Sequence, residues 1–176
     1  MIRTKVFLLL LLAGSAISCS TQKVESNPTA STSPAASTQP RNSADMVKAV
    51  ALPAEVRPND TTEAMVQVTV QNGYHINANP PTFPYLIGTE LSLQVSPPLS
   101  VSFIVYPDPI TKTFPFAEKP LAVYEGTATL KVSLKADKSA KPGTQNISGK
   151  LRVQACDDQV CYAPGTLALS IPLTIK

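Results

Sequence analysis

Alternation of apolar and polar residues is the feature that most constrains how this chain folds. In the run AMVQVTVQ, Val66, Val68 and Val70 alternate with polar residues, so the three valines share one face of an extended strand. The same period of two recurs in five later runs, at residues 90–95, 99–106, 127–134, 147–155 and 166–175. No window carries a helical period over ten residues. The sequence therefore predicts half-buried strands and an all-β fold.

Turn signals separate these runs, and the strand pattern begins at about residue 46. The turn signals are NDT at 59–61, NG at 72–73, SPP at 96–98 and KPG at 141–143. A single domain of about 130 residues with seven to nine strands fits an immunoglobulin-like β-sandwich, and a small barrel is the alternative. The run at 99–106 is expected to place four side chains on its inner face: Leu99, Val101, Phe103 and Val105. The core tryptophan of true immunoglobulin domains is absent.

The N-terminal residues are typical of an export signal. Residues 1–18 combine Arg3 and Lys5 with the apolar core VFLLLLLA, which is far shorter than the roughly 20 residues of a membrane-spanning helix. The run AGSAISC is similar to a bacterial lipobox, in which the signal is cut before a cysteine that carries a lipid. We expect a lipoprotein signal peptide over 1–18 and lipidation of Cys19. An ordinary signal peptide with an incidental thiol is the alternative.

Residues 20–45 consist almost entirely of Ser, Thr, Pro, Ala, Gln and Asn. Such a segment has too little apolar surface to offset the entropy of ordering. We therefore expect a lipid-anchored, disordered linker over 19–45 and a folded domain over 46–176. Ser20 stands where some inner-membrane lipoproteins carry an aspartate, which weakly favours a periplasm-facing location at the outer membrane.

The charge of the chain argues against nucleic acid as a partner. Removal of residues 1–18 takes Arg3 and Lys5 with it, so the 15 basic residues fall to 13 against 12 acidic ones. A net charge near +1 without a basic cluster does not provide the basic face that nucleic-acid binding needs. We expect contact with a membrane through the lipid anchor alone.

Two cysteines five positions apart, Cys156 and Cys161 in QACDDQVCYAPG, are the most reactive groups of the domain. In an oxidising compartment an even pair favours a disulfide. If DDQV is the loop of an antiparallel hairpin, opposed Cα atoms about 4.5 Å apart allow the bridge. Closing a loop of about five residues stabilises a fold by only about 2 kcal/mol, against about 4.7 kcal/mol for a hundred-residue loop. Spacing alone leaves open whether the bridge is structural or redox-active.

Two carboxylates follow the first cysteine directly. Asp157 and Asp158 are common turn residues, and turn formation is their main expected role. They should also raise the pKa of a neighbouring thiol, because a carboxylate disfavours a second negative charge nearby. Since the thiolate is the nucleophile, a raised pKa would keep a dithiol unreactive until a partner docks.

The stretch GKLRVQACDDQVCYAPGT resembles the cysteine motif of the N-terminal periplasmic domain of the thiol:disulfide interchange protein DsbD, a family that includes disulfide bond corrector domains. Three upstream stretches are similar to the same family: NGYHINANPP, YPDPITKTFPF and LAVYEGTATLKVSL. The resemblance covers residues 46–176. Its most specific element is the C-x4-C pair followed by Tyr162 and Pro164.

This resemblance implies an immunoglobulin-like sandwich and a Cys156–Cys161 pair that cycles between disulfide and dithiol. It also implies that Cys161 forms the mixed disulfide with partners and that Cys156 resolves it. Family members shield the disulfide with a short aromatic cap loop. KTFPFAEK lies at the corresponding distance upstream, so Phe114 and Phe116 are the candidate cap residues, although such phenylalanines also commonly pack in a core or loop.

The chain departs from the family pattern in two respects. Where well-known members place further aromatic residues after the GY pair, it has His75 and Asn77. His75 could act as a local acid or base for a leaving thiolate, since its ordinary pKa is near 6.5, but a lone loop histidine is commonly solvated or a capping residue. The sequence also lacks a thioredoxin-type C-x-x-C and a transmembrane pair, so we expect a membrane electron transporter to act in trans.

The sequence supports two hypotheses of function from different classes. The first is periplasmic thiol:disulfide interchange through Cys156 and Cys161, which reduces thioredoxin-fold partners without a cofactor. The alternative is a non-catalytic, lipid-anchored immunoglobulin-like binding or scaffold module with a structural disulfide. No metal is expected, because two cysteines and one distant histidine fall short of a zinc ligand set. A hydrolase finds no support, because no nucleophile motif is present.

Overall fold

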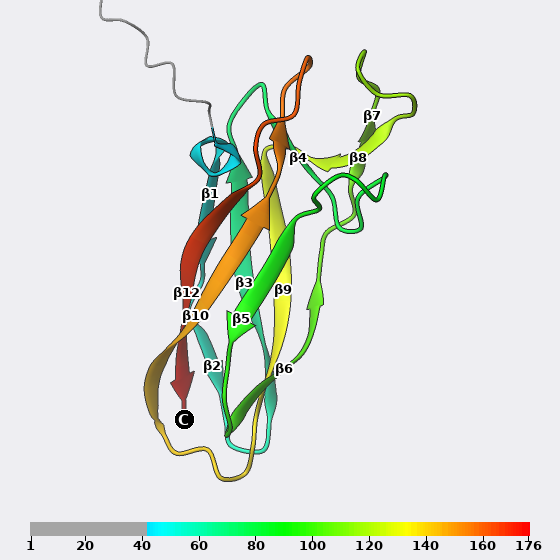
Figure 1. Ribbon diagram of the computed structural model, residues 1–176. Helices are drawn as coiled ribbons and strands as arrows, with labels where there is room; N and C mark the ends of the chain where they lie inside the picture. Colours follow the sequence, from blue (N-terminus) through cyan, green and yellow to red (C-terminus); the bar gives the residue numbers. More distant parts are fainter. Residues whose placement is uncertain (1–41) are drawn as a thin grey trace, which may run out of the picture. The chain divides into compact units, whose positions relative to one another are not determined.

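The computed structural model describes residues 42–176, and this part of the chain consists mainly of β-strands (Figure 1). The expected signal peptide, the expected lipid site at Cys19 and most of the expected linker lie outside the described residues. Between residues 42 and 176 there is no α-helix, and the single helical turn is the 3₁₀-helix η1 (Ser43–Met46). No helix in this described range is long and apolar enough to cross a membrane.

Two four-stranded sheets form an immunoglobulin-like β-sandwich (Figure 1), as predicted. The first sheet is antiparallel throughout and runs in the order β1 (Val47–Ala51), β3 (Thr61–Val70), β9 (Thr127–Ala136) and β6 (Leu99–Val105). The second runs in the order β2 (Ala54–Val56), β12 (Gly165–Ile175), β10 (Gly143–Val153) and β5 (Glu90–Gln94). In this second sheet β2 is parallel to β12, and the other pairs are antiparallel.

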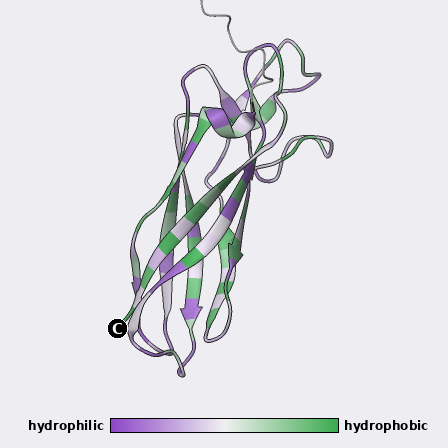
Figure 2. Ribbon diagram, turned by 60° about the vertical axis from the view of Figure 1, so that its left-hand side comes forward, coloured by the Kyte–Doolittle hydropathy of each residue, from purple (hydrophilic) through white to green (hydrophobic). Residues whose placement is uncertain are grey.

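The inner faces of the two sheets make one hydrophobic core. On β3 and β9 the residues predicted to face inward are all buried: Val66, Val68, Val70, Ala128, Leu130, Val132 and Leu134. Figure 2 shows the corresponding alternation of hydrophobic and hydrophilic residues along the long strands. Because side chains alternate between the two faces of a strand, burial of one face fixes the register of each pair.

Strand β6 departs from the predicted pattern in its second half. Leu99 is buried and Val101 is partly buried, but Phe103 and Val105 are 60% and 46% exposed. A β-bulge between Val101 and Phe103 shifts the pairing of β6 with β9. Such a shift turns the following side chains to the opposite face, so Ile104 packs against the core instead.

A third, smaller sheet lies at the end of the sandwich away from the C terminus (Figure 1). It is antiparallel and runs in the order β11 (Ala155–Cys156), β4 (His75–Asn77), β8 (Leu121–Tyr124) and β7 (Ile110–Lys112). Strands of two to four residues carry too short an alternation to be predicted from sequence. This sheet positions the candidate site, because it holds one of the two cysteines.

The described domain begins four residues before the boundary that composition indicates at Met46. Asn42 caps η1, since its Oδ1 accepts a hydrogen bond from the backbone N–H of Ala44 at 2.9 Å. In return, Asp45 Oδ2 accepts one from the backbone N–H of Asn42 at 3.2 Å. Gly165 provides the space for this cap, because an added Cβ would collide with Asn42 and Ala44. Residues 42–45 are therefore ordered as part of the capped 3₁₀ turn.

Candidate functional site

Cys156 and Cys161 form a disulfide at the end of the molecule that carries the third sheet. Their Cα atoms are 3.9 Å apart, and the two residues are antiparallel bridge partners. The backbone N–H of Asp157 donates a hydrogen bond to the carbonyl of Val160 at 3.0 Å. The segment DDQV is therefore the loop of a tight hairpin, which is the condition under which the sequence allows the bridge.

Asp157 holds this loop through its side chain. Its Oδ1 accepts hydrogen bonds from the backbone N–H groups of Gln159 and Val160, both at 2.8 Å, in an Asx-type turn. Its Oδ2 accepts a hydrogen bond from the phenolic hydroxyl of Tyr162 at 2.5 Å. The bond from Tyr162, followed by those from Val160 and Gln159, lowers the pKa of the Asp157 carboxyl. Asp157 thus has the turn-forming role that the sequence favours.

The two cysteines differ in their access to solvent. Cys156 is fully buried, whereas Cys161 is partly exposed and lines a pocket of about 280 Å³. The pocket walls come from three loops and include Tyr85, Leu86, Phe116, Ala117, Gln159 and Val160. The described residues that line the pocket carry no charged side chain. An incoming thiolate can therefore reach Cys161 more easily than Cys156.

His75 lies in β4, directly opposite Cys156 of β11. It is 1% exposed, and its ring stacks on Phe114 with the ring centroids 4.1 Å apart. Burial, and then the positive charge of Lys112, lower the pKa of His75 to about 4, so its imidazole is neutral at pH 7. Within residues 42–176 its Nε2 has no hydrogen-bond partner. The interpretation of His75 as a solvated loop histidine is wrong, because β4 pairs on both sides and buries it.

The loop between β7 and β8 carries both candidate cap phenylalanines, and their environments differ. Phe114 is buried and forms a small hydrophobic cluster with Leu121 and Val123. Phe116 is 41% exposed, stacks on Phe114 with centroids 5.3 Å apart, and lines the same pocket as Cys161. Phe116 therefore borders the accessible cysteine, while Phe114 packs beneath the surface against Phe116 and His75.

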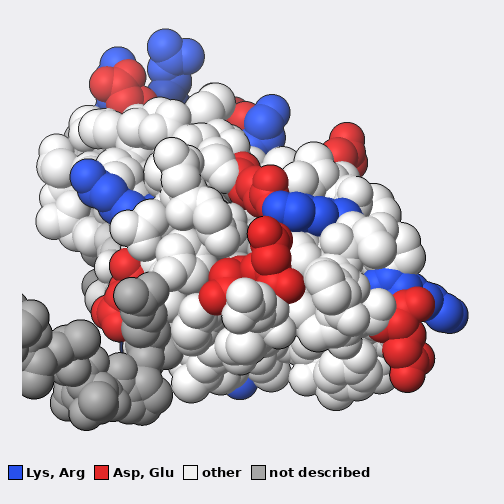
Figure 3. Space-filling model, turned by 90° about the horizontal axis from the view of Figure 1, so that it is seen from above, with Lys and Arg blue, Asp and Glu red and all other residues white. Residues whose placement is uncertain are grey.

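A group of charged side chains lies beside the site. Lys112 Nζ is 2.6 Å from Glu125 and 3.8 Å from Asp158, and it lies 5.4 Å from the centroid of the Phe114 ring. Figure 3 looks onto this end of the molecule and shows acidic and basic side chains in contact, with uncharged surface around them. The Asp158 side chain is 77% exposed, so its ion pair contributes less than about 1 kcal/mol. An effect of Asp158 on the thiol pKa stays a prediction.

Ser43 supports the site and is a residue that sequence analysis missed. It is fully buried; its Oγ donates a hydrogen bond to the carbonyl of Ala163 at 2.6 Å and accepts one from the backbone N–H of Ala155 at 2.9 Å. Ala155 and Ala163 lie on the two arms of the cysteine hairpin. The spacing of Asn42 and Asp45, which resembles a capping box, is the signal that could have marked this segment as ordered.

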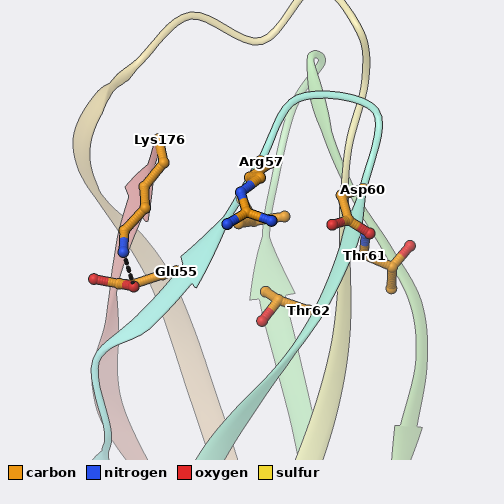
Figure 4. Close-up of a pocket in the computed structure, with 7 residues that line it drawn as sticks. Glu55, Arg57, Asp60, Thr61, Thr62 and Lys176 are labelled. Carbon is orange, nitrogen blue, oxygen red and sulfur yellow. Dashed lines mark hydrogen bonds and ion pairs between the residues drawn. The ribbon is translucent and has the colours of Figure 1, made fainter.

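A second pocket, of about 250 Å³, lies at the end of the sandwich that holds the C terminus. Figure 4 shows its polar lining, in which Lys176 pairs with Glu55 near Arg57 and Asp60. The described residues that line this pocket include no cysteine and no histidine. It is therefore separate from the disulfide site.

The family model for the N-terminal domain of the thiol:disulfide interchange protein DsbD matches residues 44–171, a range that contains both cysteines. The chain belongs to this family. The members of this family are thiol:disulfide interchange domains. In this chain the two cysteines of the motif, Cys156 and Cys161, form a disulfide.

The first of two similar solved structures, with a TM-score above 0.5, is consistent with the fold. The N-terminal periplasmic domain of ScsB from Proteus mirabilis aligns with a TM-score of 0.52 and 16% identity, over 72% of this chain and 46% of that one. This chain therefore spans about half the length of that ScsB chain. The N-terminal domain of DsbD from Neisseria meningitidis, in its reduced form, aligns with a TM-score of 0.44 and 15% identity, over 65% of this chain and 79% of that one. Comparison with curated protein sequences finds no match.

Proposed function

We propose that this domain exchanges disulfides with thioredoxin-fold proteins through Cys156 and Cys161. The observation that carries the proposal is the unequal exposure of the two residues. Cys161 opens onto an uncharged pocket and Cys156 is fully buried, which is the arrangement expected of an attacking and a resolving cysteine. Membership of the DsbD N-terminal family supports the same chemistry.

In the first half of the cycle a partner thiolate attacks the sulfur of Cys161. The Cys156–Cys161 bond breaks, and its electron pair stays on the sulfur of Cys156, which then takes up a proton. A second thiolate of the partner attacks the partner sulfur in the mixed disulfide and releases Cys161 as a thiolate, which also takes up a proton from solution. The partner leaves as a disulfide, and the domain has gained two electrons and two protons.

In the second half of the cycle the Cys161 thiolate attacks a disulfide of an oxidised client. The resulting mixed disulfide is resolved when the Cys156 thiolate attacks the sulfur of Cys161. The client leaves as a dithiol, and the Cys156–Cys161 bond forms again. The hairpin hydrogen bonds made by Asp157 and Ser43 support fast resolution, because they hold the two arms together without the disulfide.

The proposal includes a periplasmic location with a lipid on Cys19 and a membrane electron transporter as the electron donor. The export signal and the lipobox-like run in the sequence support the location.

A trapping experiment tests the exchange. In Cys156→Ala the resolving thiol is gone, so Cys161 should accumulate a stable mixed disulfide with a thioredoxin-fold protein supplied in oxidised form. In Cys161→Ala the remaining thiol is buried and should give no adduct. Absence of an adduct in Cys156→Ala, or equal adducts in both variants, would contradict the proposal.

A further inference from the structure

We propose that His75 donates a hydrogen bond from Nε2–H to the sulfur of Cys156 as that sulfur becomes a thiolate. The proposal rests on the exchange function above and adds a residue that stabilises the leaving sulfur. This residue, His75, lies on β4, the strand that pairs with the β11 strand of Cys156.

The register of the third sheet brings the two residues together. Cys156 and His75 are Cα partners in the antiparallel pair β11–β4, so their side chains lie on the same face. Directly opposed residues of such a pair have Cβ atoms about 4.5–5.5 Å apart. Both residues are buried, and the stack of the imidazole on Phe114 limits the orientations of the ring.

The unpaired nitrogen of His75 gives the second observation. Within residues 42–176, Nε2 has no hydrogen-bond partner while the disulfide is intact. Buried polar groups are almost always paired, so an unpaired one calls for an explanation. A disulfide sulfur is at best a weak acceptor, whereas a thiolate accepts a charge-assisted hydrogen bond. The acceptor for Nε2–H would therefore arise when the S–S bond breaks.

The position of Cys156 creates the need for such a donor. Because this cysteine is fully buried, water does not solvate the charge left on its sulfur. A preorganised donor aimed at the developing charge lowers the barrier, as donors in an oxyanion hole do. The electron pair of the S–S bond goes to Cys156, the Nε2–H stays on the imidazole, and the proton that later reaches the sulfur comes from the solution.

The charged groups around His75 are consistent with a neutral donor. Burial, and then Lys112, disfavour imidazolium and lower the pKa of His75, while Glu125, Asp158 and Asp157 oppose them more weakly. A neutral imidazole still carries one N–H, so its donor role does not require protonation. The proposed hydrogen bond is thus available at neutral pH without a second buried charge.

The test measures how fast dithiothreitol reduces the disulfide of the full chain. His75→Phe keeps an aromatic ring beside Phe114 and removes the donor, and we expect its second-order rate constant to fall about tenfold. A rate constant within about twofold of the unmodified protein would overturn the proposal. If His75→Phe does not fold, His75→Gln and His75→Leu replace it. The amide donor of glutamine should then give the faster reaction, and equal rates would overturn the proposal.

A second readout separates hydrogen bonding from packing. In a Cys161→Ser background, Cys156 is the one cysteine left in residues 42–176. The pKa of its thiol can be measured from the absorbance of the thiolate as the pH is raised. Loss of the donor in His75→Phe should raise the pKa of the Cys156 thiol by about one unit, which is a tenfold decrease in its acid dissociation constant. An unchanged pKa would count against the donor role. Neither readout uses a protein partner. If the trapping experiment gives no adduct but His75→Phe shows the expected slower reduction and raised thiol pKa, the proposed function is rejected and the hydrogen bond from His75 to Cys156 is retained.

Discussion

Tyr162 donates a hydrogen bond from its hydroxyl to Oδ2 of Asp157, across the loop that the disulfide closes. Asp157 also accepts hydrogen bonds from the backbone N–H groups of Gln159 and Val160 in the same loop. These bonds close the hairpin in parallel with the S–S bond. None of these bonds involves a cysteine sulfur, so we expect them to persist after cleavage of the disulfide and to keep the two thiols close in the dithiol form.

Replacement of Asp157 should have an effect that depends on pH. The folded-state pKa of Asp157 lies below its value of about 3.9 in unfolded chains, so the ionised carboxylate stabilises the fold above about pH 4. This stabilisation is lost as the pH falls through the lowered folded-state pKa. Urea unfolding should therefore show Asp157→Asn less stable than the unmodified protein at pH 6, with a smaller difference near pH 3.

The matched control for this prediction is Asp158→Asn. The Asp158 side chain is largely exposed and makes one long ion pair, so its removal should change the free energy of unfolding by less than about 1 kcal/mol. An Asp157→Asn effect of equal size at both pH values would show that the ionised carboxylate is not what holds the loop.

Ser43→Ala should destabilise the domain by about 1–3 kcal/mol, measured as the free energy of unfolding. The substitution removes one buried and one partly buried hydrogen bond and leaves the backbone N–H of Ala155 without the Ser43 acceptor. Ser170→Ala, on an exposed position of β12, is the control and should stay within about 0.5 kcal/mol. Equal stability of the two variants would mean that η1 does not hold the cysteine hairpin.

The two candidate cap phenylalanines, Phe114 and Phe116, should respond differently to truncation. Phe114→Ala removes a buried ring from the cluster with Leu121 and Val123, and should cost about 3–5 kcal/mol of stability. Phe116→Ala removes a half-exposed ring that borders Cys161, so it should cost less stability and speed reduction by dithiothreitol. Slower or unchanged reduction in Phe116→Ala would show that this ring does not shield the disulfide.

The long strands could be predicted from sequence because burial repeats at every second residue. The valines of β3 and the leucines of β9 face the core as the alternation indicates. The outward orientation of Phe103 could not be predicted. A bulge shifts the pairing of β6 with β9 by one residue, and the apolar–polar alternation of the sequence carries no sign of that shift. The same limit applies to Ser43, whose two partners are backbone groups about 110 to 120 positions away.

The candidate site was predictable in its chemistry but not in its surroundings. The spacing of Cys156 and Cys161 and the turn residue Asp157 indicated a closed hairpin, which the structure contains. The burial of His75 depends on pairing between strands of two and three residues that are distant in sequence. Nothing within a few residues of His75 encodes that pairing, so a single sequence suggested a loop.

The reduction potential of the Cys156–Cys161 pair tests the central claim most directly. It can be measured by equilibrating the full chain with a thioredoxin couple and counting free thiols at each ratio. Exchange activity predicts a potential between about −180 and −270 mV, among the working couples of exchange proteins. A potential below about −300 mV, with no exchange over minutes, would contradict the account and make the disulfide a structural one.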